Sequence, residues 1–148
     1  MRAILLILIG LSSLLNSLNI PEFTKQNGVV TDSVTQLEWQ DDYSDNGGDI
    51  KETAWKNAIV YCESLTLNGQ SDWRLPNINE LSSLVDDGKY NPSINSIFEL
   101  TSSNYYWSAT TVANSSNDAW IVNFDSGSVY YDSLKGYNYY VRCVRAGE

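Results

Sequence analysis

Side chains with hard oxygen donors crowd the segment 41–49. They are Asp41, Asp42, Asp45, Asn46 and Asp49, with two glycines among them. Calcium takes about six to eight oxygen ligands, so a flexible acidic loop of this kind predicts a calcium site formed by the four aspartates. The alternative is a solvated loop before a helix, whose positive N-terminal end favours nearby carboxylates. Because the segment lacks the Asp-x-Asp-x-Asp-Gly order of an EF-hand, both interpretations stay open.

Tyrosines gather near the C-terminus and form a second candidate site. Those expected to bind a ligand are Tyr130, Tyr131, Tyr137 and Tyr140. A tyrosine ring presents a flat apolar face with a polar group at its end, which suits stacking against a sugar ring or a protein partner. The alternative is that strand alternation buries about half of these rings and that the others are ordinary surface residues.

Catalytic chemistry has little support in the composition. Histidine is absent, which removes the commonest general base and the commonest zinc ligand. Eighteen acidic side chains supply by chance the carboxylate pairs that glycoside hydrolysis needs, and Arg74 is expected to hold Glu80 or Asp72 in a structural contact. We therefore predict no enzymatic activity. The alternatives are a secreted hydrolase or oxidase with unrecognised carboxylates and a purely structural envelope protein.

Charge and length limit the partners. The 148 residues include 9 basic and 18 acidic side chains, a formal net charge of −9 at pH 7. A chain of this length has room for one domain, and its acidic surface repels nucleic acid and anionic lipid headgroups. We expect no nucleic-acid partner and no cofactor apart from calcium. The partners that remain are an extracellular glycan, a surface protein, or further copies of the chain in a homo-oligomer.

Residues 1–19 are typical of a secretory signal peptide. Met1 and Arg2 precede the apolar stretch 3–15, which is too short to cross a bilayer, since a span needs about 20 residues. We expect cleavage and no stable membrane span; a permanent anchor is the alternative. The prediction is an exported protein, either secreted, periplasmic or held at the cell surface, with residues 22–148 forming a single domain.

Residue spacing predicts strands at both ends of this domain. The predicted strands are 29–31, 37–39, 105–111, 119–124, 128–131 and 139–145. The first two are expected to form a hairpin. In the segment 119–124, alternation places Trp120, Val122 and Phe124 on one apolar face, where Trp120 is expected in the core.

Two helices are predicted between these groups of strands. Apolar residues at intervals of three and four predict a helix over 55–65, with Thr53 as its N-cap. A shorter helix starts at Asn77, which forms a capping box with Glu80, and ends at Gly88. The order of strands, helices and strands is typical of an α+β fold with a mainly antiparallel sheet.

The chain has two cysteines, Cys62 on the first predicted helix and Cys143 on the inward face of the last strand. Export into an oxidising compartment and the even count predict a disulfide between them. Two buried free thiols are the alternative.

Several motifs follow one another in a specific order. They include Leu37-Glu38-Trp39-Gln40, Thr53-Ala54-Trp55, Ser71-Asp72-Trp73-Arg74-Leu75-Pro76, Tyr105-Tyr106-Trp107-Ser108 and Val141-Arg142-Cys143-Val144-Arg145. This series resembles the domain at the C-terminus of the Legionella collagen-like adhesin, over residues 28–145. The Arg-Leu-Pro run is also similar to the formylglycine-generating enzymes and, more distantly, to C-type-lectin-like folds.

The resemblance implies a C-type-lectin-like fold, in which a disulfide joins the first helix to the last strand, and an exported bacterial binding or adhesion module for a glycan or surface protein. The adhesin's domain is trimeric and binds sulfated polysaccharides, a ligand that suits a positive surface. This chain is acidic, so sulfated glycans are not expected. It also lacks the collagen-like stalk that would drive trimerisation. The copper-binding cysteines of the formylglycine enzymes do not carry over to a disulfide-bonded pair.

Overall fold

The structure, a computed structural model, describes residues 22–147, so the predicted signal peptide at residues 1–19 lies outside the described residues. The strands are β1 (Phe23–Gln26), β2 (Val29–Asp32), β3 (Leu37–Gln40), β4 (Glu52–Thr53), β5 (Tyr105–Val112), β6 (Ser115–Asn123), β7 (Ser128–Leu134), β8 (Tyr139–Tyr140) and β9 (Val144–Ala146). The helices are the 3₁₀ turn η1 (Ser44–Asn46), α2 (Trp55–Ser64) and α3 (Ile78–Ser82). The predicted α+β class is confirmed.

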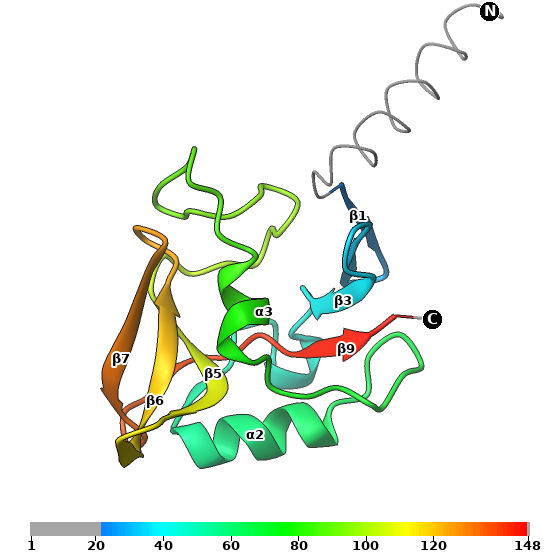
Figure 1. Cartoon of the computed structure of the whole chain (residues 1–148). Helices are drawn as coiled ribbons and strands as arrows, with labels where there is room; N and C mark the ends of the chain where they lie inside the picture. The colour runs from blue at the N-terminus through cyan, green and yellow to red at the C-terminus, as the bar shows by residue number, and fades with distance from the viewer. Residues whose placement is uncertain (1–21, 148) are drawn as a thin grey trace, which may run out of the picture.

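The larger sheet has the order β4-β8-β5-β6-β7, and its pairing is antiparallel except between β5 and β8. Figure 1 shows α2 crossing beneath this sheet and α3 beside β5. Both helices pack against this sheet, and neighbouring residues on β5 contact different helices because side chains alternate between the two faces of a strand. Trp107 packs in a core cluster with Ala58 and Cys62 of α2, whereas Tyr106 packs in a second cluster with Leu81 of α3.

The smaller sheet has the order β1-β2-β3-β9. Its hairpin between β2 and β3 is confirmed, whereas β1 was not predicted. The turn between β1 and β2 is Asn27-Gly28, and both residues have positive φ, 51° and 74°, as a two-residue hairpin turn requires. A Cβ on Gly28 would clash with the Cβ of Asp42, so the close packing of the loop that follows β3 also requires glycine here.

Helix boundaries differ from the prediction at two points. Thr53 is not an N-cap, because it lies in β4, where it pairs with Tyr139; the N-cap of α2 is Ala54, which makes no capping side-chain bond. The capping box of α3 is confirmed, with Asn77 accepting from the Glu80 amide at 2.8 Å. That helix ends at Ser82 rather than at position 88, since the chain then enters a short β-bridge at residue 85.

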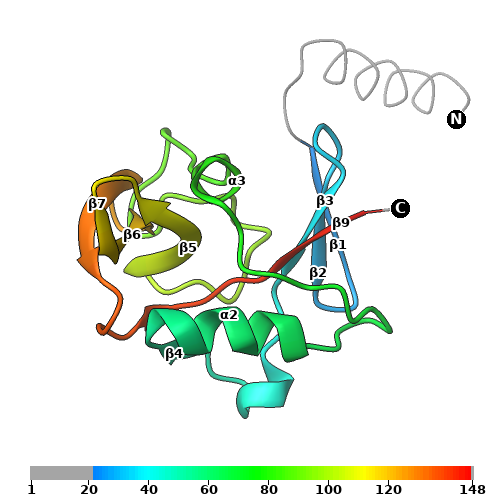
Figure 2. The same cartoon turned by 60° about the horizontal axis from the view of Figure 1, so that its bottom comes forward.

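The disulfide between Cys62 and Cys143 is confirmed and ties α2 to the residue that precedes β9. Figure 2 shows the last segment of the chain, in red, passing alongside α2 on its way to β9. The predicted strand 139–145 is therefore two short strands, and residues 141–143 between them lie buried beside the helix. This arrangement is compatible with a C-type-lectin-like fold. Within residues 22–147, no helix is long and apolar enough to span a membrane.

Candidate functional site

Asp41, the first residue of the predicted calcium loop, is buried among protein donors. Its Oδ2 accepts from the Lys25 ammonium at 2.7 Å and from the Glu99 amide at 2.9 Å. Its Oδ1 accepts from the Leu100 amide at 3.2 Å and from the Arg142 guanidinium at 3.4 Å. The side chains of Asp41 and Arg142 are both fully buried. Two cations of the protein therefore already neutralise this carboxylate.

The other three aspartates of the loop do not join Asp41 around a common point. Asp42 accepts from the backbone amide of Ser44 at 2.8 Å, and Asp45 accepts from the Tyr61 hydroxyl at 3.2 Å. Asp49 is exposed. In the part of the chain that the structure describes, no three His, Cys, Asp or Glu side chains form a group that could hold a metal ion. Calcium binding stays a prediction without geometric support.

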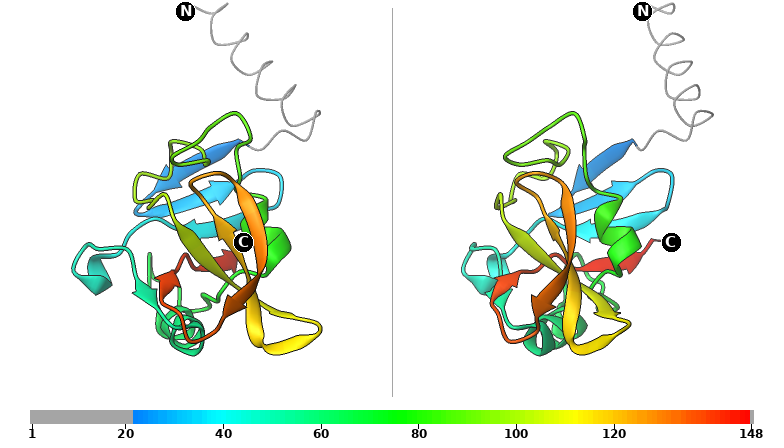
Figure 3. Two further views of the ribbon diagram at one scale, coloured as in Figure 1. Left: turned by 90° about the vertical axis from the view of Figure 1, so that its left-hand side faces the viewer. Right: turned by 60° about the vertical axis from the view of Figure 1, so that its left-hand side comes forward.

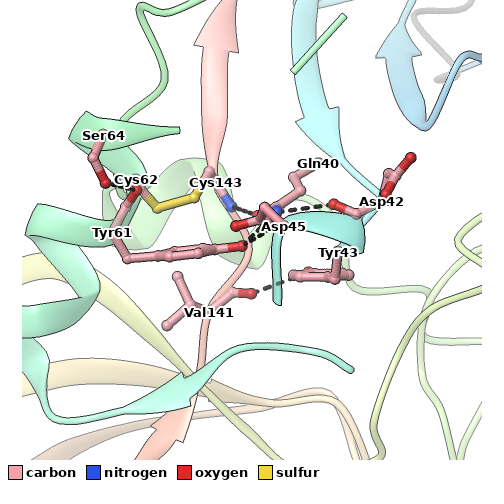
Figure 4. The surroundings of a disulfide bond; sticks show 9 residues. All are labelled: Gln40, Asp42, Tyr43, Asp45, Tyr61, Cys62, Ser64, Val141 and Cys143. Carbon is pink, nitrogen blue, oxygen red and sulfur yellow. Dashed lines mark hydrogen bonds between the residues drawn. A yellow bond between two sulfur atoms is a disulfide. The ribbon is translucent and has the colours of Figure 1, made fainter. Parts of the chain in front are cut away.

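Gln40 links the loop to the disulfide, as Figure 4 shows. Its Oε1 accepts from the Cys143 amide at 3.3 Å, and its Nε2 donates to the Tyr61 hydroxyl at 2.9 Å and to the Asp42 carbonyl at 3.0 Å. Tyr61 lies one position before Cys62 on α2, and burial raises the pKa of its hydroxyl. These groups are consistent with a structural polar network around the disulfide.

The charged residues of the remaining motifs also pair with one another. Arg74 donates two hydrogen bonds to Glu80, at 2.8 and 2.7 Å, which confirms the expected contact and lowers the pKa of Glu80. Arg145 contacts both Asp72, at 2.6 Å, and Glu38. The hydrogen bond from Arg145 lowers the pKa of the Asp72 carboxyl. Lowered pKa values suit permanent ion pairs rather than general acids, which need raised ones.

Two of the predicted ligand-binding tyrosines belong to one row of rings on the α2 side of the sheet. Tyr130 packs edge-on against Tyr105, with ring centroids 5.8 Å apart, and Tyr137 packs against Tyr139 at 6.1 Å. Tyr105 and Tyr139 join the two pairs at 5.2 Å and pack against the core. Tyr130 and Tyr137 are 38% and 52% exposed, so they form the outer ends of this row.

The other two predicted tyrosines lie elsewhere. Tyr131 faces the opposite side of β7 from its neighbour and packs against Trp120, with ring centroids 5.4 Å apart. Tyr140 packs against the buried ring of Tyr106 and lines a separate hollow with Asp49. The four tyrosines thus occupy three places rather than one surface.

A groove lies beside the pair formed by Trp120 and Tyr131. It is open, has a mainly apolar wall and a volume of about 670 Å³, and is completed by residues 110–115 and Asp118. Tyr131 is 60% exposed. Figure 3 shows the turn between β5 and β6, in yellow, extending away from the rest of the sheet. The groove therefore lies at a projecting rim, where a large ligand has access.

Irregular strand pairing forms this groove. On β7 the register steps from Tyr130 to Ser133, so that two residues, Tyr131 among them, stand opposite the single residue Trp120. A second register shift lies on the other side of Trp120, across residues 107–111 of β5. Bulges of this kind redirect side chains and are frequent beside binding and active sites. The rim is therefore shaped locally rather than being the frayed end of a regular sheet.

The prediction for Trp120 was right about its face and wrong about its burial. Trp120 does share a face with the buried Val122, but its ring is only partly buried and belongs to neither core cluster. Strand alternation reports the face of a residue and not how far the neighbouring layer extends. Trp120 was accordingly missing from the predicted ligand-binding residues, of which Tyr131 alone lies in the groove.

Comparison with known proteins agrees with the motifs in the sequence. None of the curated proteins compared matches the chain. The profile of the Lcl C-terminal domain matches residues 28–145, which include α2, α3, the disulfide and the rim groove. This match spans most of the chain, so the protein belongs to the Lcl C-terminal domain family.

Proposed function

We propose that this protein is an exported binding or adhesion module that holds a glycan in the rim groove beside Trp120 and Tyr131, without catalysis. The observation that carries the proposal is the aromatic pair itself. Its rings line an open groove, and the strand irregularity on β7 directs Tyr131 toward Trp120.

The chemistry of the groove matches a sugar ring. One face of a pyranose is lined by C–H groups and its edge by hydroxyls, so it needs an apolar floor with polar groups around it. The two rings supply the floor, and the threonine, serine and asparagine side chains of residues 110–115, together with Asp118, supply hydrogen-bonding groups. Ligand sites commonly combine apolar walls with a few polar groups in this way.

Export is supported by two features. Structural disulfides persist mainly in oxidising compartments, and the sequence motifs resemble the C-terminal domain of a bacterial adhesin. The absence of catalysis is supported by the absence of histidine and by the ion pairs that lower the pKa values of Asp72 and Glu80. Secreted, periplasmic and surface-bound locations all agree with these features.

A glycan array on the oxidised protein tests the proposal. Trp120→Ala and Tyr131→Ala remove the two rings and are each expected to weaken binding at least tenfold, since stacking provides the apolar contact. Tyr90→Ala is the matched control, because Tyr90 is 84% exposed on a different part of the surface. Its binding should equal that of the unmodified protein.

Two results would refute this function. An array without signal, together with self-association of the protein, would favour the structural envelope protein. Turnover of a glycan or peptide that is abolished by a single carboxylate substitution would favour the secreted hydrolase or oxidase.

A further inference from the structure

We infer that the rim groove selects uncharged sugars and rejects sulfated and carboxylated ones, with Asp118 as the residue that determines this specificity. The inference rests on the proposed function and specifies its ligand. It is carried by the charge of the groove wall, which is the opposite of what an anionic glycan requires.

Asp118 is the ionisable acid of the groove wall. Its side chain is half-buried, and its Oδ2 accepts a hydrogen bond from the Ser115 hydroxyl at 2.6 Å. Both residues lie on β6, just after the turn from β5, and the bond holds the carboxylate in place. A carboxylate is an acceptor only, so a ligand group that faces Asp118 must donate a hydrogen bond.

Sugar hydroxyls meet this requirement and anionic substituents do not. A hydroxyl donates a hydrogen bond and benefits from a charged acceptor. A sulfate or carboxylate group has only acceptor oxygens at neutral pH. Next to Asp118 it can form no hydrogen bond, and the two negative charges repel each other. Rejection of this kind is how a site discriminates against a closely related competitor.

A compensating cation is held away from the ligand. Lys135 contacts the groove wall through Thr111, but its ammonium lies 3.9 Å from the centroid of the Trp55 ring. The same ammonium donates to the Thr111 hydroxyl and the Ser116 carbonyl, both at 2.8 Å. None of the residues that line the groove is a lysine or an arginine. An anionic sugar would have to break these Lys135 contacts to be neutralised.

Paired glycans of the same backbone, with and without sulfate, test the inference. We expect binding to the uncharged member and at least tenfold weaker binding to the sulfated one. The affinity for the uncharged member should change little between low and high salt, because no charge on the ligand is screened. The protein carries a formal net charge of −9, so binding of the sulfated member should improve as salt rises.

Asp118→Asn separates the side chain's charge from its shape. The asparagine oxygen can still accept from Ser115, so this contact within β6 is kept while the negative charge is lost. We expect the preference for the uncharged member to fall at least threefold. Asp125→Asn is the matched control, because it removes the same charge from an exposed turn outside the groove. It should leave the preference unchanged.

The failure of this inference differs from the failure of the proposed function. Preferential binding of the sulfated member that Trp120→Ala abolishes would refute the selectivity and keep the groove as the glycan site. Equal loss of preference in both aspartate variants would show that net charge, and not Asp118, is responsible. Binding of a peptide instead of any glycan, or glycan binding that Trp120→Ala leaves intact, would refute both.

Discussion

The surroundings of the disulfide and the rim groove use their polar and aromatic residues in opposite ways. Around the disulfide, charged side chains are paired with one another inside the protein, as Asp41 is with Arg142. At the rim, Trp120 and Tyr131 pack together and remain accessible. Residue type alone therefore does not identify a ligand site in this domain, since the charged side chains, which are the most able to do chemistry, have structural roles.

The motifs that indicate the family belong mainly to the surroundings of the disulfide, which we call the first region. Arg74, Asp72, Arg142 and Arg145 all make internal ion pairs. They hold the loops and the last strand against the rest of the domain. The groove is lined by β5, β6, the turn between them and Tyr131 of β7. It lies outside those ion pairs, so its residues can change without disturbing the framework.

Removal of the disulfide should be the most damaging change to the first region. The bond closes a loop with a sequence separation of 81, for which the chain-entropy model gives about 4 to 5 kcal/mol. We expect the double variant Cys62→Ser, Cys143→Ser to lose about that much free energy of unfolding in urea titrations. Reduced protein should unfold at the same urea concentration as the variant. Equal stability of the oxidised protein and the variant would contradict the prediction.

Loss of the buried carboxylate should come next. Asp41→Asn leaves Arg142 buried without its anion, a change that costs about 3 to 5 kcal/mol in comparable buried pairs. Thermal and chemical unfolding measure the effect. Asp49→Asn is the control, because Asp49 is exposed in the same loop, and it should change stability by no more than about 0.5 kcal/mol. Similar values for both variants would place Asp41 outside any stabilising network.

The ion pair between Arg74 and Glu80 should contribute less and in a pH-dependent way. Glu80→Gln keeps a side chain able to form the capping box and removes the charge, at a cost of about 0.5 to 1 kcal/mol at neutral pH. The pKa of Glu80 is lowered in the folded protein, chiefly by the hydrogen bond from Arg74. Its contribution is therefore complete above the unfolded pKa of about 4.3 and is lost as the pH falls through the lower folded value.

Unfolding of the unmodified protein and of Glu80→Gln, measured between neutral pH and about pH 2, checks this pH dependence. The difference between their unfolding free energies should disappear at the acid end. Glu63→Gln, at an exposed position of α2, should show no such closing gap. A gap that widens in acid would contradict the pairing.

The rim should tolerate substitutions that the first region does not. Tyr131→Ala removes a ring that is 60% exposed, so we expect a loss of only about 0.5 kcal/mol in unfolding free energy. Together with the expected loss of glycan binding, this would separate function from stability. A loss as large as that of Asp41→Asn would show that the rim is part of the framework.

Chelation should have no effect on stability. A bound calcium ion would raise the melting temperature, and its removal would lower it. Because Asp41 is already neutralised by Lys25 and Arg142, we expect equal melting temperatures with calcium and with chelator. A drop on chelation would restore the acidic loop as a metal site.

Local features of the sequence predicted local structure well. Spacing placed α2, capping chemistry placed the start of α3, and the even cysteine count predicted the disulfide. The Asn27-Gly28 pair indicates the first hairpin as well, although β1 was not among the predicted strands. The ends of elements were less predictable. Thr53 lies in a strand and not at the N-cap of α2 because it pairs with Tyr139, a residue distant in the chain.

The candidate site was harder to predict for a physical reason. The partner of Asp41 is Arg142, separated from it by 101 positions, and no local pattern connects the two. Likewise, the register shifts that bring Tyr131 to Trp120 depend on how three strands pair. The sequence shows that tyrosines cluster near the C-terminus, but not which of them lie together in the fold.

The disulfide also keeps the domain in one piece after a single cut within the loop that it closes. Both strands that pair with β6, and the projecting turn between β5 and β6, lie between Cys62 and Cys143 in the chain. A protease that cuts this exposed turn leaves two fragments joined through sulfur. Cleaved molecules would therefore run as one species until a reductant is added, and a nicked domain would stay attached to whatever holds either end.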